Sequence, residues 1–209
     1  MARYTGPVCR LCRREGTKMF LKGERCVNGK CPLEGKKNVA PGAHGAGRRN
    51  VKEYGLQLRE KQKSKRYYGV LENQFKGLYV RSTKMDGVTG DNLLSLLERR
   101  LDNVVYKTGL ASSRKEARQL IAHGHFRLNG KKVTIPSMVV NAGDVLTLRE
   151  ASRSSEKFKT LIEGLETQVA PKWIELDKAQ AVAKITALPA RDDVDFPFEE
   201  HLIVELYSK

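Results

Sequence analysis

Apolar residues in the middle of the chain recur with the period of an α-helix. Side chains three or four residues apart predict helices over residues 54–69, 71–79 and 93–101, and a glycine-rich break at 87–90 separates the last two. Each pattern places its apolar residues on one face, which is typical of helices that pack on a core. We therefore expect a helical domain over residues 51–98.

The next stretch begins with a well-marked helix. Ser113 and Glu116 have the spacing of a capping box, in which the hydroxyl accepts a backbone hydrogen bond and the carboxylate reaches back toward the cap. Apolar residues then line one face, and Gly124 is placed to end the helix. The pattern predicts a helix between Ser113 and Gly124.

Short strands are expected after that helix. Asn129-Gly130 is a dipeptide typical of a two-residue β-hairpin turn. Apolar runs around and beyond this turn predict strands at residues 126–128, 131–133, 139–140 and 145–148. We therefore expect a small α+β module over residues 99–165, with two helices and short antiparallel strands.

The two ends of the chain have weaker patterns. Residues 1–50 are rich in glycine and proline and have no clear period, so we expect an irregular segment that a metal or a partner orders. Residues 166–209 contain a strand signal at 173–176 and a helix signal at 198–206, and we expect this segment to pack back on the helical domain. The predicted fold class is α+β, a mostly helical domain with the small module inserted.

Composition argues against a membrane protein. Of the 209 residues, 40% are hydrophobic and 30% are charged. No apolar run approaches the roughly 18 to 20 residues that span a bilayer, and the first residues, MARYTGP, lack the apolar core of a secretory signal. We expect a cytoplasmic protein without a disulfide framework.

Charge is distributed very unevenly. The net charge is +15 and the sequence pI is about 9.8. Residues 1–90 carry +14, residues 91–150 carry +4 and residues 151–209 carry −3. This asymmetry favours a basic arm on a nucleic acid, because a basic membrane helix would need a continuous apolar face. The acidic C-terminal part is poorly suited to RNA; it is expected to pack on the helical domain or face a basic protein neighbour, and a simple solvated surface is the alternative.

All four cysteines lie near the start of the chain, with the spacing C-x2-C-x13-C-x4-C: Cys9, Cys12, Cys26 and Cys31. Two close pairs can place four thiolates around one tetrahedral ion, which would staple the N-terminal segment. Zinc is the first choice, an iron–sulfur cluster stays open, and free thiols or disulfides are the alternative. Nearby Lys and Arg side chains should lower the thiol pKa. His44 is expected to be a loop residue.

Basic residues are dense at the beginning of the helical domain. The run that should contact RNA phosphates, together with Arg3 near the start of the chain, comprises Arg59, Lys61, Lys63, Lys65 and Arg66. Few acidic residues offset this run in the sequence. An ordinary solvated helix face is the alternative interpretation.

The module carries a second basic group. Arg114, Lys115 and Arg118 are predicted on the exposed side of the capped helix, whose cap is Ser113. The turn and hairpin that follow add His123, His125, Lys131 and Lys132. A helix beside a basic hairpin would form a cationic groove suited to folded RNA. No nucleophile or carboxylate accompanies the histidines in a triad-like pattern, so we expect no enzyme.

Several runs together carry a resemblance to a known family. They are residues 99–106 (RRLDNVVY), 111–121 (ASSRKEARQLI), 123–125 (HGH), 129–133 (NGKKV), 2–7 (ARYTGP), 40–45 (APGAHG), 58–63 (LREKQK) and 200–209 (EHLIVELYSK). The chain resembles the bacterial S4 family of small-subunit ribosomal proteins, in its cysteine-containing form, over essentially its whole length.

The resemblance implies a structural protein that binds small-subunit rRNA and nucleates subunit assembly. It also implies contacts with mRNA where the message enters the ribosome, contacts with ribosomal protein S5 and other small-subunit proteins, and an influence on translational accuracy. By analogy, Arg48, Arg49 and Lys52 lie where the family places the cations that face mRNA. No membrane partner and no homo-oligomer are expected.

Two other functions are compatible with parts of the sequence. An RNA-modifying enzyme, or another RNA-binding factor, could carry the same module, but residues 151–209 leave no room for a catalytic domain. A DNA-binding zinc regulator would need a recognition helix, and Gly16 and Gly23 interrupt the segment between the cysteine pairs. A structural rRNA-binding protein is therefore the preferred interpretation.

Overall fold

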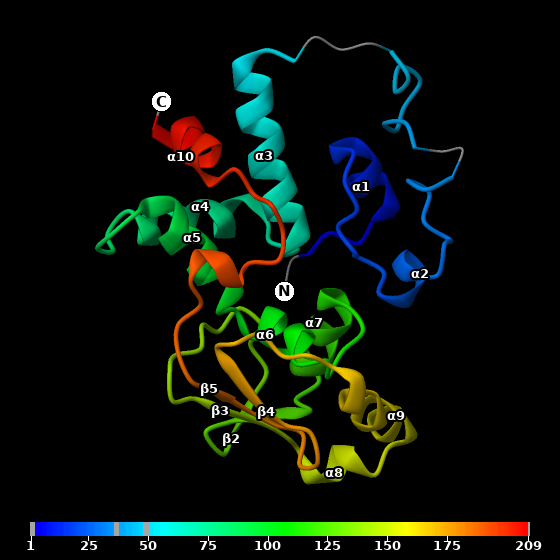
Figure 1. Cartoon of the computed structure of the whole chain (residues 1–209), viewed down its shortest axis with the longest axis vertical. Coiled ribbons are helices and arrows are strands. Elements are labelled where there is room, and N and C mark those ends of the chain that lie inside the picture. The colour runs from blue at the N-terminus through cyan, green and yellow to red at the C-terminus, as the bar shows by residue number, and fades with distance from the viewer. Residues whose placement is uncertain (1–2, 36–37, 48–50, 209) are drawn as a thin grey trace. The chain divides into compact units, whose positions relative to one another are not determined.

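The computed structural model describes residues 3–35, 38–47 and 51–208 (Figure 1). The chain divides into two compact units. The helical unit consists of Met1–Leu93 and Phe196–Lys209, and the sheet unit consists of Leu94–Asp195. The beginning and the end of the chain therefore belong to the same unit.

Helices dominate the helical unit. Its described residues form α1 (Cys9–Glu15), α2 (Glu24–Val27), α3 (Glu53–Tyr67), α4 (Glu72–Ser82), the first part of α5 (Thr89–Glu98) and α10 (Glu200–Ser208). The helices predicted from residue 54 onward and at the end of the chain are confirmed, with boundaries that differ by a few residues. The N-terminal segment is less irregular than expected, since it contains α1 and α2. Their charged and polar residues give no apolar period by which sequence could reveal them.

An aromatic cluster ties the end of the chain to α3 and α4. The Tyr67 ring lies 4.7 Å from that of Phe196 and 5.4 Å from that of Phe198, between centroids. Tyr207 of α10 stacks on Tyr79 of α4 at 4.6 Å. Burying an aromatic or large aliphatic side chain contributes about 1.5–3 kcal/mol, so these rings explain why α10 packs on α3 (Figure 1).

The sheet unit contains the predicted module and more. Its helical elements are α6 (Leu101–Lys107), α7 (Arg114–Ala122), α8 (Glu150–Arg153), α9 (Glu156–Gly164) and the 3-10 turns η1 (Leu165–Thr167) and η2 (Arg191–Asp193). Its strands are β1 (Phe126–Leu128), β2 (Lys131–Val133), β3 (Val145–Leu148), β4 (Ile174–Asp177) and β5 (Val182–Ile185). The strands pair antiparallel in the order β2-β1-β3-β5-β4.

The core of the sheet unit lies where α6, α7 and α9 meet the sheet. Ile121 of α7, Phe126 of β1, Leu146 of β3 and Leu165 are fully buried, and Trp173 is 2% exposed. The alternation of β3, with Leu146 and Leu148 buried between less buried neighbours, is that of a strand with one face on a core.

The hairpin and the helix cap form as predicted, with one change. Asn129 and Gly130 have φ values of 51° and 76°, the left-handed pair that a type I′ turn requires. The Ser113 hydroxyl accepts a hydrogen bond from the Glu116 amide at 3.3 Å. The Glu116 carboxylate, however, accepts from the backbone of Ser112 at 2.8 Å rather than from that of the cap residue.

Two expectations about strands and boundaries differ from the structure. Residues 139–140 form no strand among the described residues, and Val139 makes only an isolated bridge with Arg100. The segment 166–209, expected to pack as a whole on the helical domain, divides: β4 and β5 extend the sheet, and only the part from Phe196 onward joins the helical unit. The segment divides because β5 pairs with β3, which is distant in sequence, and no local pattern specifies that pairing.

Candidate nucleic-acid interface and cysteine pocket

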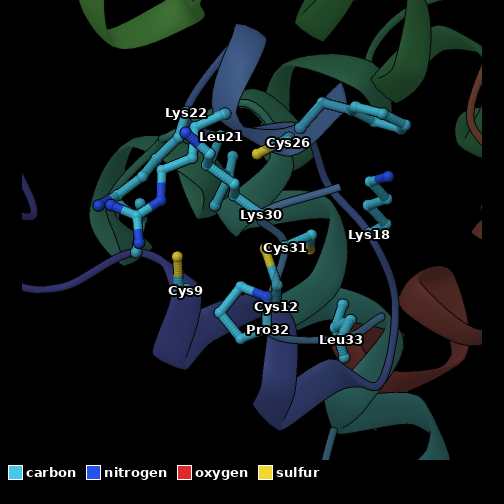
Figure 2. Close-up of a pocket in the computed structure, with 13 residues that line it drawn as sticks. Cys9, Cys12, Lys18, Leu21, Lys22, Cys26, Lys30, Cys31, Pro32 and Leu33 are labelled. Carbon is cyan, nitrogen blue, oxygen red and sulfur yellow. The ribbon is translucent and has the colours of Figure 1, made fainter. Parts of the chain in front are cut away.

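The four cysteines line one pocket, as their spacing predicted (Figure 2). Cys9 and Cys12 lie on α1, Cys26 lies on α2, and Cys31 follows in the loop. All four are free thiols, so the alternative of a disulfide framework is not what the structure contains. Within residues 3–35, 38–47 and 51–208, no three ligand side chains already have the arrangement of a metal site.

Burial, not the neighbouring cations, governs the thiol whose pKa is shifted. Burial raises the pKa of Cys12; a hydrogen bond from the backbone of Met19 works against this, and the other three thiols raise it further. The expectation that Lys and Arg side chains would lower this pKa was therefore wrong for Cys12, although Lys22, Arg25 and Lys30 also line the pocket. Four soft donors that repel one another as thiolates are the donor set that a zinc ion neutralises, so the residues fit that ion.

The basic run on α3 is largely paired with carboxylates. Glu15 at the end of α1 has a fully buried side chain and accepts from Arg59 at 3.2 Å and also from Arg66. Burial raises the pKa of Glu15, against the opposing effect of those two guanidinium groups. The pairs turn Arg59 and Arg66 toward α1 and fasten the N-terminal segment to α3.

The lysines of the same run have partners too. Lys61 and Lys65 donate to Glu72 of α4 at 2.7 and 2.8 Å, and Lys63 donates to Glu60 at 2.5 Å. Burial alone would raise the pKa of Glu72, but hydrogen bonds from the two lysines and Tyr207 outweigh it and lower the pKa to about 2. The expectation that few acidic residues offset this run was wrong, because Glu60 lies within α3 itself and Glu15 and Glu72 reach the run from α1 and α4.

Two arginines of the sheet unit are buried, contrary to expectation. Arg114 donates to Asn103 at 2.8 Å and lies 4.4 Å from the centroid of the Tyr106 ring, while Arg118 donates to Asp102 at 3.3 Å. Both arginines are less than 10% exposed. The helical period placed them on the solvent side of α7, but α6 packs along that side and buries them.

The surface that remains on the sheet unit is still cationic. Lys115, His123, Lys131 and Lys132 are exposed, whereas the cap residue Ser113 is buried. His125 is partly buried and lies 2.9 Å from the Ser152 hydroxyl. Burial lowers the pKa of His125, and His123, Lys157 and Arg149 lower it further.

Two members of that surface were not predicted. Arg149, which is exposed, and Lys157, which pairs with Glu116 at 2.5 Å, lie close enough to His125 to act on its pKa. Both residues are far from His125 in sequence, so no local pattern indicated that they would lie near it. Gly124, between the two histidines, is buried beneath this surface: it has φ of +76°, and a Cβ there would collide with the Lys132 side chain.

The remaining candidates are Arg3, Lys52, Arg48, Arg49 and His44. Arg3 and Lys52 are exposed, and Lys52 is the residue just before α3. Arg48 and Arg49 lie outside the described residues. His44 is an exposed loop residue, as expected. Among the described residues, no helix is long and apolar enough to cross a membrane.

Comparisons with known proteins agree with this architecture. The model of the ribosomal protein S4/S9 N-terminal domain matches residues 3–98, and that of the S4 domain matches residues 99–146. The chain is 62% identical to small ribosomal subunit protein uS4 of Clostridioides difficile (strain 630), over 209 residues and all of both chains. It is 58% identical to that of Geotalea uraniireducens and 56% to that of Pelotomaculum thermopropionicum, again over all of both chains.

These relatives share the length of the chain as well as its sequence, so the similarity is not limited to the small module that other RNA-binding proteins could carry. The chain belongs to the bacterial uS4 family of small ribosomal subunit proteins.

Proposed function

We propose that this protein is a structural constituent of the small ribosomal subunit, that it binds small-subunit rRNA, and that it acts in the cytoplasm as part of the ribosome. Full-length identity to uS4 proteins is the observation that carries this function. The family is one of structural ribosomal proteins rather than of enzymes, and the role proposed here is binding.

The binding mechanism follows from which cations face solvent. Phosphate contacts give affinity, and fit to the shape of folded RNA gives selectivity. The exposed residues that suit phosphates best are Arg3, Lys115, His123, Lys131 and Lys132. The predicted contacts of α3, which are Arg59, Lys61, Lys63, Lys65 and Arg66, are half-buried or buried and share their donors with carboxylates. They would contribute less to the affinity.

Binding to the correct RNA is the test. Full-length protein should bind a small-subunit rRNA transcript with a strong salt dependence, and should bind a large-subunit fragment of equal length much more weakly. Tagged protein should also sediment with small subunits from cell extract. Equal affinity for both RNAs, together with absence from small subunits, would refute the function.

The finer roles implied by the family are part of the proposal. They are nucleation of subunit assembly, contact with mRNA where it enters the ribosome, contact with ribosomal protein S5, and an effect on decoding accuracy. The exposed Lys52 supports an mRNA contact near the start of α3, to which Arg48 and Arg49 would add. Crosslinking of Lys52 variants to a short mRNA on assembled ribosomes tests that contact, and an undiminished crosslink in Lys52→Ala would contradict it.

We also propose a structural zinc ion at Cys9, Cys12, Cys26 and Cys31. The support is that the four free thiols line one pocket and have the paired spacing of tetrahedral thiolate sites. When bound, zinc would draw the thiolates together and order the segment that connects α1 and α2. Elemental analysis of protein purified without added metal should give zinc near one per chain, and Cys26→Ser should lose it. Iron instead of zinc would indicate the iron–sulfur alternative, and neither metal would reject the site.

A further inference from the structure

Helix α4 has an outer face that neither the predicted RNA contacts nor the packing of the helical unit uses. The inner face is buried through Phe75, Leu78, Tyr79 and Ser82. The opposite side of the helix is exposed, and so is Lys84 in the turn after α4. We call these residues together the α4 outer face: Asn73, Lys76, Gly77, Val80, Arg81 and Lys84. Successive positions are three residues or one residue apart, so the members within α4 lie along one side of the helix, and Lys84 continues that side in the turn after it.

The cations of the α4 outer face are free, unlike those of α3. The side chains of Lys76, Arg81 and Lys84 make no hydrogen bond or ion pair with any other described residue. The single carboxylate of α4, Glu72, lies at its beginning and is held by Lys61 and Lys65. The face therefore keeps its full positive charge for a partner from outside the chain.

Gly77 supplies a second, independent observation. Glycine is among the least favourable residues in the interior of a helix. A Cβ at Gly77 would meet nothing within 4 Å, and its φ is not in the left-handed region. No neighbour in the described part of the chain therefore requires a glycine here. Its effect is outward: it leaves the backbone bare between Lys76 and Arg81, where another surface could approach closely.

We propose that the α4 outer face binds the sugar-phosphate backbone of rRNA, with Lys76, Arg81 and Lys84 on phosphates and Gly77 at the point of closest approach. The inference rests on the proposed rRNA-binding function and adds an interface to it. Lys76 and Arg81 are about 8 Å apart along the helix axis, so they can reach different phosphates of one strand. The face has no large exposed aromatic residue, which is the kind of anchor that protein interfaces use, so RNA fits it better than a protein does.

The test uses two variants: one removes the positive charge of the α4 outer face, and the other covers the backbone at Gly77 with a side chain. The first variant combines Lys76→Gln, Arg81→Gln and Lys84→Gln. Its matched control, which removes the same charge from exposed positions of the sheet unit, combines Lys159→Gln, Lys172→Gln and Lys184→Gln. The affinity of each full-length protein for small-subunit rRNA is measured between 100 and 400 mM KCl, roughly the range in which counterion release dominates.

The second variant, Gly77→Leu, adds bulk at the proposed point of contact. Its control is Gly164→Leu at the end of α9, where a Cβ also meets nothing within 4 Å. Both changes favour helix formation, so the melting temperature should rise or stay the same. A loss of RNA affinity by Gly77→Leu alone would therefore come from the blocked surface and not from unfolding.

The expected result is a clear split between the variants and their controls. The α4 triple variant should bind rRNA on the order of tenfold or more weakly at 100 mM KCl and lose about two to three units of salt slope. Gly77→Leu should bind several-fold more weakly, and both controls should stay within about twofold. Equal losses in the two triple variants would show that only net charge matters and would overturn the proposal, as would unchanged affinity of Gly77→Leu.

Two further outcomes separate this proposal from its neighbours. If the unaltered protein does not prefer small-subunit rRNA, the proposed function fails and this surface fails with it. If the unaltered protein binds but the α4 variants match it on naked rRNA, only the surface is rejected. Should those variants then enter reconstituted small subunits poorly, the face meets an acidic protein instead, which also overturns the RNA contact.

Discussion

Asp102 is the carboxylate around which two arginines of the sheet unit are arranged, and replacing it tests whether they serve folding. Its side chain is 5% exposed and accepts from Arg100 at 3.1 and 2.7 Å and from Arg118 at 3.3 Å. Asp102→Asn keeps the shape of the side chain but removes its charge. Two guanidinium groups, 3% and 10% exposed, would then lose the charge of Asp102.

The size of the effect follows from burial. Removing one partner of a buried ion pair costs about 3–5 kcal/mol, whereas an exposed pair contributes about 0–1 kcal/mol. Because the Arg118 contact is longer, at 3.3 Å, and the Arg118 side chain is 10% exposed, we expect a loss of about 3–4 kcal/mol in the free energy of unfolding of the sheet unit. With a urea slope of about 2 kcal/mol/M, the unfolding midpoint should fall by about 1.5–2 M.

The assay uses the only tryptophan of the chain. Trp173 belongs to the sheet unit and is 2% exposed, so its fluorescence reports the unfolding of this unit. Asp192→Asn is the control, because Asp192 is exposed and should shift stability by less than about 0.5 kcal/mol. If both variants shift the urea midpoint equally, the burial argument is wrong.

The same reasoning changes what is expected of Arg118. From sequence, Arg118→Ala should weaken RNA binding and flatten its salt dependence. Given the Asp102 contact, we now expect first a loss of stability, by about 1–3 kcal/mol. An Arg118→Ala protein with an unchanged urea midpoint and a reduced salt slope would restore the original interpretation.

Three further predictions concern the helical unit. Since the pKa of Glu72 is lowered to about 2 from 4.5, its ion pairs should stabilise the fold fully above pH 4.5 and weaken as the pH falls toward 2. When unfolding is followed by circular dichroism during an acid titration, the free energy of unfolding of Glu72→Gln should vary with pH by about 1–2 kcal/mol less than that of the unaltered protein. This figure is discounted for the solvent exposure of Glu72. Tyr207→Phe removes a hydrogen bond of 2.9 Å to Glu72 and should cost about 1 kcal/mol in thermal unfolding. Glu15→Ala leaves Arg59 without that carboxylate, so limited proteolysis should cut the N-terminal segment faster, and unchanged cleavage would show that Glu15 does not hold it.

Sequence predicted best those elements whose signals are local. The cap at Ser113 and the Asn129-Gly130 turn specify their own backbone geometry, so α7 and the β1–β2 hairpin form where expected. The apolar stripes of α3, α4 and α10 predicted helices for the same reason. By contrast, β5 was missed, because no local turn dipeptide marks its beginning and its place in the sheet comes from pairing with β3 and β4.

Long-range pairing limited the rest of the fold. The sheet places β5 between β3 and β4, which brings residues 174–185 into the sheet unit. The segment that begins at Phe196 instead joins the aromatic cluster of α3. Local patterns alone cannot show which segment joins which unit, because residues 174–185 and the segment from Phe196 onward both mix apolar and polar residues.

Spacing predicted which cysteines share a pocket, the metal at that pocket stays a prediction, and charge predicted poorly which cations are exposed. The spacing of the cysteines predicted that they would come together, and they line one pocket. The exposure of cations was harder to predict, because it depends on which helix covers them. Arg114 and Arg118 lie on the correct side of α7 for solvent, yet α6 covers that side.

Carboxylates from neighbouring helices decide which cations the fold leaves for RNA. Glu15 and Glu72 reach α3 from α1 and α4 and occupy much of its basic run, whereas no carboxylate pairs with the described cations of the α4 outer face. A net charge of +15 counts both groups alike, but only unpaired cations can release counterions from phosphates without first breaking an ion pair. The salt dependence of rRNA binding should therefore respond more to Lys76 and Arg81 than to Lys61, although the denser run in the sequence suggests the reverse.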